Sequence, residues 1–175
     1  MEMVEYVLVR GLSQVLPNVC KLSWEAIRRI FNKPPEELTD DELRELTDRN
    51  KDAAWAMYIQ MITRITTQPL PDKHGDEQTA LDSVYSLFAT TRDILTEYGR
   101  EAPEFSKLAV LILNQKVRPF TAAWHKKSLA GAFDDPVACA EFREEHEALR
   151  VILCGYMDAL AVLAGVEEIT DISEV

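Results

Sequence analysis

Glycine and proline are scarce in this sequence, with six and eight residues in a chain of 175, and they fall at apparent element boundaries. Glycine-rich phosphate loops are absent, as are the G-x-S-x-G, H-E-x-x-H and zinc-finger spacings. The missing motifs lower the expectation of an enzyme without excluding one. We therefore predict no cofactor and leave catalysis open.

Cysteine is scarce as well. Cys20, Cys139 and Cys154 form no C-x-x-C pair, and an odd number of cysteines is typical of a reduced cytosolic protein. No apolar run approaches the roughly 18 residues that a membrane span needs, and Glu2 and Glu5 stand where a signal peptide needs basic residues. These absences predict a soluble cytoplasmic protein without membrane association.

Histidines and acids form no recognisable metal-binding pattern. The helical di-iron pattern needs repeated E-x-x-H, but Arg143 stands three residues before His146. Glu42, Glu45 and Asp48 share a helix face, as they would in helical magnesium-dependent nucleotide hydrolases, but no second carboxylate pair matches them. We interpret the three acids as a solvated first turn favoured by the helix dipole, and we predict no metal site.

The composition is that of one globular domain, with 47% hydrophobic and 28% charged residues. A chain of this length buries roughly 70% of the surface that its unfolded form exposes, so one core is sufficient. The formal net charge of −11 opposes binding of the whole molecule to nucleic acid or anionic membrane. We predict a single helical domain over residues 1–175 and do not expect nucleic acid as a partner.

Apolar residues recur at helical spacing over most of the chain. Long helices are expected from Thr39 to Thr67, from Asp76 to Tyr98, from Pro103 to Gly131 and from Pro136 to Ala164. Short connections force neighbouring helices to turn back on each other, so the fold class is all-α, an antiparallel four-helix bundle with one or two extra N-terminal helices. Residues 1–35 would cover the bundle, although 4–9 also fit a strand; residues 39–165 would form it, and 166–175 would be an acidic tail.

Polar and special residues mark the expected helix ends. Thr39 opens a capping box, and Asp76 and Asp135 are expected N-caps. Gly99 and Gly165 are expected stops, with Gly99 in the left-handed conformation. The residues expected to face the core include Ala54, Met57, Met61 and Ile65 in the first long helix, Leu81, Val84, Tyr85, Phe88 and Leu95 in the second, Val117, Phe120 and Trp124 in the third, and Phe142, Leu149, Leu153 and Leu160 in the last.

A basic segment stands out against the acidic chain. Residues 105–133 contain five basic residues and no acidic one: Lys107, Lys116, Arg118, Lys126 and Lys127. One interpretation is that these residues pair inside the bundle with acids of the last helix or of the first long helix: Glu141, Glu144, Glu145, Glu42 and Glu45. The other is that the segment binds an anion or an acidic partner, with Arg118 favoured because its guanidinium grips a carboxylate or phosphate with two parallel hydrogen bonds.

A polar stripe runs along the same helix. Asn114, Arg118 and His125 fall within roughly 60° of one another, and Pro119 is expected to bend the helix by displacing the carbonyl of Gln115. His125 is interpreted as a structural hydrogen-bonding residue rather than a general base, because no partner can be named from spacing. The candidate binding residues, which include some from facing helices, are Asn114, Arg118, Thr121, His125, Lys107, Arg64, Tyr85 and Arg92.

Three stretches together resemble a family of uncharacterised bacterial proteins: Y-I-Q-M-I-T-R-I-T-T at 58–67, A-L-D-S-V-Y-S-L-F-A-T-T-R at 80–92 and N-Q-K-V-R-P-F-T-A-A-W-H at 114–125. The family has an L-N-x-x-L-R-P-F-x-x-x-W-H block. This sequence departs from it with Val117 for leucine, and Lys126 stands where a proline often follows. The resemblance covers about half of the chain and implies a bacterial origin and a helical fold, without an established activity.

The leading functional hypothesis is an accessory subunit that binds a protein partner or a second copy of itself. It is motivated by the strong core pattern, the missing catalytic motifs and the segregated basic segment. One alternative is an anion- or nucleotide-binding bundle, possibly catalytic, with its pocket around Arg118 and His125. A third is a helical subunit of an antiviral nucleoprotein complex, in which the basic segment would contact RNA or DNA phosphates.

Overall fold

The computed structural model describes residues 40–71 and 75–166, with side chains from residue 48 onward, and in these residues it contains helices and no strand. The all-α prediction is confirmed. The helical elements are α3 (Asp40–Ile62), η3 (Ile65–Thr67), α4 (Glu77–Tyr98), α5 (Pro103–Ile112), η4 (Leu113–Val117), α6 (Arg118–Leu129), η5 (Ala132–Asp134) and α7 (Pro136–Ala164). The predicted N-terminal helices, the capping box at Thr39 and most of the acidic tail lie outside the described residues.

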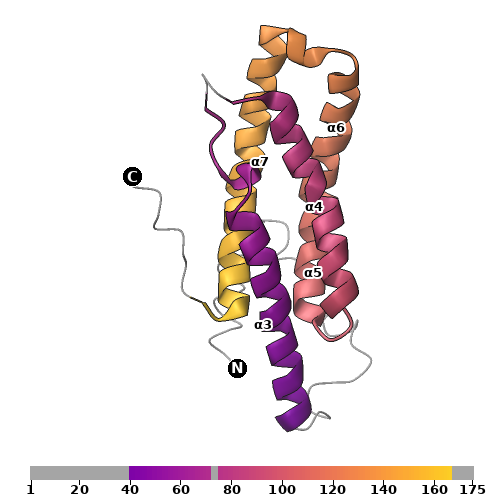
Figure 1. Ribbon diagram of the computed structural model, residues 1–175, viewed down its shortest axis with the longest axis vertical. Coiled ribbons are helices and arrows are strands. Elements are labelled where there is room, and N and C mark those ends of the chain that lie inside the picture. The colour runs from indigo at the N-terminus through magenta and orange to yellow at the C-terminus, as the bar shows by residue number, and fades with distance from the viewer. Residues whose placement is uncertain (1–39, 72–74, 167–175) are drawn as a thin grey trace.

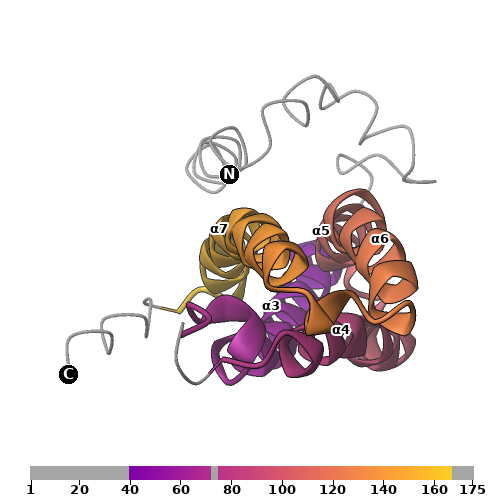
Figure 2. The ribbon, with the colours of Figure 1, turned by 90° about the horizontal axis from the view of Figure 1, so that it is seen from above.

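The helices run side by side with alternating direction (Figure 1). Helix α3 packs most extensively against α7 and also contacts α4 and α5, while α4 contacts α6 and η4. Seen from above, α3, α4, α6 and α7 surround one core, with α5 leading into α6 (Figure 2). This arrangement agrees with the predicted antiparallel bundle. None of the described helices has the length and hydrophobicity that crossing a membrane requires.

Most helix ends follow the sequence signals. The side chain of Asp76 accepts a hydrogen bond from the amide of Thr79 at 2.6 Å, and Asp135 does the same for Val137 at 3.0 Å. Gly165 ends α7 with φ of 69°, a left-handed conformation that favours glycine. The prediction for Gly99 is wrong: its φ is −57° and its amide still bonds to the carbonyl of Leu95, so right-handed backbone continues into the turn.

The first long helix is shorter than predicted. It ends at Ile62, and the chain then extends at Arg64 before the single turn η3. The hydroxyl of Thr67 donates to the carbonyls of Met61 and Arg64 at 2.9 and 3.1 Å. Side chains that bond to nearby backbone compete with the helix in this way, which explains the early end. Ile65, predicted to be buried, is 46% exposed.

Aromatic residues form the part of the core between α6, η5 and α7. Trp124 is fully buried, as predicted, and it meets Phe142 edge-on with 5.0 Å between ring centroids. Val117 and Phe120 are also buried as predicted. The inward prediction for Tyr85 is wrong, because the side chain is 59% exposed. The buried stripe of α4 runs through Leu81, Val84, Leu87 and Thr91, which leaves Tyr85 on its flank.

A single arginine fixes the connection between α3 and α4. The Arg143 guanidinium, on α7, pairs with Glu77 at 2.7 Å and donates to the carbonyls of Leu70, Pro71 and Gly75 at 3.1 to 3.3 Å. Both members of the ion pair are mostly buried, with 23% and 14% of their side chains exposed. Because these contacts use most of the guanidinium's donors, they hold the start of α4 firmly on α7.

Candidate functional site

The helix after α5 changes geometry at the start of the site. Between Leu113 and Val117 the backbone forms a π-helical turn, and the amide of Arg118 bonds to the carbonyl of Leu113, five residues back. Pro119 has no amide to donate and sits in the first turn of α6, where helices tolerate proline. The expected local distortion at Pro119 is therefore present, in the form of a widened turn just before the proline.

The basic segment divides into two kinds of residue. Lys127 pairs with Glu141 at 2.8 Å and lies over the ring of Trp124, whose indole N–H donates to Glu145 at 2.8 Å. The Lys127 contact agrees with the interpretation that the basic residues pair inside the bundle. In the described part of the chain, by contrast, Lys116, Arg118 and Lys126 make no ion pair with an acidic residue.

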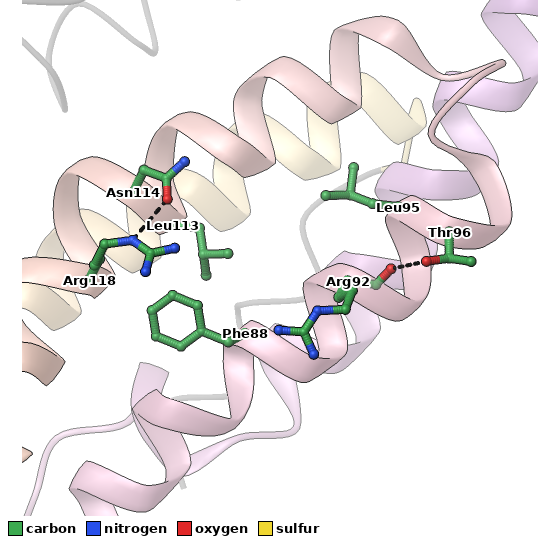
Figure 3. Close-up of a pocket in the computed structure, with 7 residues that line it drawn as sticks. All are labelled: Phe88, Arg92, Leu95, Thr96, Leu113, Asn114 and Arg118. Atoms are coloured by element: carbon green, nitrogen blue, oxygen red, sulfur yellow. Dashed lines mark hydrogen bonds between the residues drawn. The ribbon is translucent and has the colours of Figure 1, made fainter.

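Arg118 borders a groove between α4 and the η4–α6 junction, which we call the seam groove (Figure 3). It has a volume of about 330 Å³ and is open to solvent. The residues that line it are Phe88, Arg92, Leu95 and Thr96 from α4, Leu113 and Asn114 from η4, and Arg118 from α6. Three of these side chains are apolar and four are polar or charged, so the groove combines apolar contact with hydrogen-bonding groups.

Two contacts hold the Arg118 side chain in place. Its Nε donates to Asn114 Oδ1 at 3.0 Å, and its guanidinium lies over the Phe88 ring, 5.2 Å from the centroid. Neither contact uses the terminal Nη groups. The Arg92 guanidinium extends into the same groove from the opposite helix (Figure 3). Arg92 is exposed and also makes no ion pair within the described residues, and no acidic residue lines the groove that the two arginines share.

An aromatic pair continues the same seam. Tyr85 and His125 stack with 6.1 Å between centroids and 18° between ring planes, and Phe88 lies 5.7 Å from Tyr85. Both members of the stacked pair are exposed. Stacking on Tyr85 is thus the contact that the His125 ring makes among the described residues, and the expected hydrogen bond remains a prediction. Tyr85 and His125 form the aromatic end of the seam, and Arg92 and Arg118 form its arginine end.

The other candidate residues lie elsewhere. Arg64 sits between α3 and α4, where it donates to Ser86, Thr90 and Gln60, and burial lowers the pKa of its guanidinium. Thr121 is buried, and its hydroxyl bonds to backbone carbonyls of its own helix. Lys107 is half-buried on α5, away from the groove-lining residues, and burial lowers the pKa of its ammonium group.

The groove walls are not evident from the sequence pattern. Phe88 and Leu95 were expected to be core residues, and Thr96, whose hydroxyl bonds to the carbonyl of Arg92 at 2.8 Å, was not considered. One available signal was the spacing of Tyr85, Phe88 and Arg92, which places them on one flank of α4 at positions i, i+3 and i+7.

The site offers binding groups rather than a catalytic set. His125 has no carboxylate partner and no nucleophile against it among the described residues, so general-base chemistry lacks its orienting group. Nor do the described residues bring together three side chains of the kinds that ligate metals. What the groove provides is two guanidinium groups, one amide, one aromatic face and apolar walls.

No protein-family model, curated protein or solved structure matches the chain. The fold and the groove define an all-α protein with an exposed, arginine-flanked seam, and its function is argued from that geometry.

Proposed function

We propose that this protein is an accessory subunit that binds an acidic segment of a protein partner in the seam groove. The observation that carries the proposal is the pair Arg92 and Arg118, which line one groove that has no carboxylate among its lining residues, in a chain of net charge −11. In such an acidic chain, cations left free of internal pairing are available to a partner's acids.

The chemistry of the groove favours carboxylates. Contacts to Asn114 and Phe88 fix the Arg118 side chain through its Nε and its flat face, and among the described residues the Nη groups make no ion pair with a carboxylate. An arginine that is already ordered loses less conformational entropy on binding, so each new hydrogen bond contributes more to affinity. Arg92 supplies a second positive charge across the groove.

The test uses fluorescence anisotropy with a fluorescein-labelled, alanine-based peptide carrying several glutamates, and the same peptide with glutamines. We expect the wild-type protein to bind the glutamate peptide only, and Arg92→Glu/Arg118→Glu to lose at least about tenfold in affinity. Lys51→Glu is the control for a charge reversal outside the groove, because Lys51 lies on α3 and its ion pair with Asp48, at 3.6 Å, is exposed. Equal binding by the reversal variant would refute the proposal.

A second candidate is a binder of small organic anions, which the two guanidinium groups in one groove of about 330 Å³ favour by their charge. Thermal shift with ATP and with inorganic phosphate separates the two functions. Stabilisation by ATP that Arg118→Ala abolishes, together with no binding of the glutamate peptide, would assign the groove to a small molecule.

A further inference from the structure

We infer that the occupant of the seam groove is an amphipathic helix of the partner, carrying an aromatic residue and a carboxylate seven positions apart. The inference rests on the proposed function and specifies its ligand. It comes from the register of the two helices that form the seam.

The aromatic end and the arginine end are the same distance apart on both helices. On α4, Tyr85 precedes Arg92 by seven residues; on α6, Arg118 precedes His125 by seven. The helices run in opposite directions, so Tyr85 meets His125 while Arg118 lies over Phe88 and shares the groove with Arg92. At 1.5 Å of rise per residue, the two ends are roughly 10 Å apart.

A partner helix reproduces this distance with the same spacing. Residues i and i+7 lie on one face of a helix, about 10.5 Å apart along its axis. An aromatic side chain at one position would pack on the stacked Tyr85 and His125 rings, and a carboxylate at the other would lie between Arg92 and Arg118. The aromatic contact adds apolar burial, and the arginines fix direction and register.

An extended strand spans the same distance in about three residues, but the seam is a poor surface for one. Groove residues from α4 and α6 belong to continuous helices whose backbone amides and carbonyls are bonded internally. A strand lying on them would leave its own N–H and C=O groups without protein partners, whereas a helix satisfies its backbone internally. The geometry therefore favours the helix-in-groove mode.

The experiment compares labelled alanine- and glutamine-based helical peptides, each with one phenylalanine and one glutamate. The test peptide separates the two by seven positions. A spacing of four keeps them on one face but shortens the distance to about 6 Å, and a spacing of nine places them on opposite faces. We expect the seven-spaced peptide to bind at least about tenfold more tightly than either control.

Variants of the protein test which peptide residue binds at the aromatic end of the seam and which at the arginine end. Tyr85→Ala should remove the affinity that the peptide's phenylalanine contributes and keep the affinity that its glutamate contributes. Arg118→Lys keeps the positive charge but cannot form two parallel hydrogen bonds, so it should weaken the glutamate contribution and keep that of the phenylalanine. Lys51→Glu should leave both unchanged. ¹H–¹⁵N spectra should show the largest peptide-induced shifts at α4 and α6.

The outcomes separate this inference from the proposed function. Binding that depends on Arg92 and Arg118 but is equal at all three spacings would overturn the helical register and leave the proposed function standing. Absence of any arginine-dependent binding would overturn both. Self-association that competes with the peptide would assign the groove to a second copy of this chain and would also overturn the inference.

Discussion

The Arg118 side chain is held in place by two neighbours that do not neutralise its charge. Asn114 accepts one hydrogen bond from it and Phe88 receives its flat face, and neither carries a charge. Lys127, nine residues later on the same helix, is instead paired with Glu141 and packed on Trp124. The two basic residues thus differ in their surroundings: Lys127 connects α6 to α7 through an ion pair, whereas Arg118 is held by uncharged neighbours.

His146 is the residue whose titration should control stability. It is buried beside Phe120 and Phe142, and its Nε2 has no hydrogen-bond partner among the described residues. Burial lowers its pKa below the ordinary value of 6.5. Above that value the imidazole is neutral in both states. At pH values below 6.5 the unfolded chain binds a proton at His146 and the folded chain does not. The free energy of unfolding therefore decreases as the pH is lowered, until the pH reaches the lowered pKa of the folded state.

Urea unfolding at several pH values from about 7.5 down to about 5.5 measures this dependence. The free energy of unfolding should fall by up to about 1.4 kcal/mol per pH unit below the ordinary histidine pKa, and His146→Phe should flatten the curve. His125→Gln, at an exposed position, is the control and should keep the slope. An unchanged slope in His146→Phe would mean that another group titrates.

Predictions of which side chains are buried were correct at the centre of an apolar helix face, where periodicity alone decides burial. They were wrong for a residue at the margin of such a face. Trp124 and Val117 lie at the centre of their apolar stripe and are buried, but Tyr85 lies 100° from Val84 and is exposed. Spacing also placed Asn114, Arg118 and His125 on one side of their helix. It could not show that Phe88 and Thr96 face them, because that depends on how α4 packs.

At the scale of elements, η4 sets the register between α5 and α6. A turn closed five residues back contains one residue more than an α-helical turn, so η4 acts as a one-residue insertion in a continuous helix. Leu113 and Asn114 contribute to the groove from this turn. The sequence predicted a distortion from Pro119, but a proline signal does not distinguish a bend from a widened turn.

Removing one residue tests this description. Deletion of Gln115, an exposed residue of η4, should restore an uninterrupted α-helix with α5 and α6 in nearly unchanged phase, so the protein should remain folded. Deletion of Val110, an exposed residue of α5, should rotate the helix before it by about 100° and expose core residues. Thermal melts followed by circular dichroism compare the two. Equal loss of stability would contradict the insertion model.

Helix boundaries were predictable where a side chain caps the backbone. Asp76 and Asp135 satisfy free amides, and that chemistry is visible in sequence. The end of α3 was not predictable, because Thr67 ends it through a contact six residues back to Met61. The Arg143 contacts with the α3–α4 connection are longer in range still, joining residues more than 60 positions apart, and no local pattern indicates them.

For the whole molecule, the central feature is the contrast between a net charge of −11 and the two arginines of the seam groove, which make no ion pair among the described residues. A net negative charge opposes the approach of acidic partners at long range, so the proposed binding in the groove depends on attraction at short range. Screening by salt reduces both effects, since the Debye length falls from about 10 Å at 0.1 M to about 3 Å at 1 M. The proposed function therefore requires that specificity come from direct contact with the arginines.

A charge-swap titration tests that claim most directly. The affinities of wild-type protein and Arg118→Glu are measured by anisotropy for the seven-spaced peptide with glutamate and for the same peptide with arginine. We predict that the wild type prefers the glutamate peptide and that Arg118→Glu reverses the preference, with a coupling of at least about 1.5 kcal/mol. A variant that loses affinity for both peptides equally, without reversal, would contradict direct recognition of a carboxylate by Arg118.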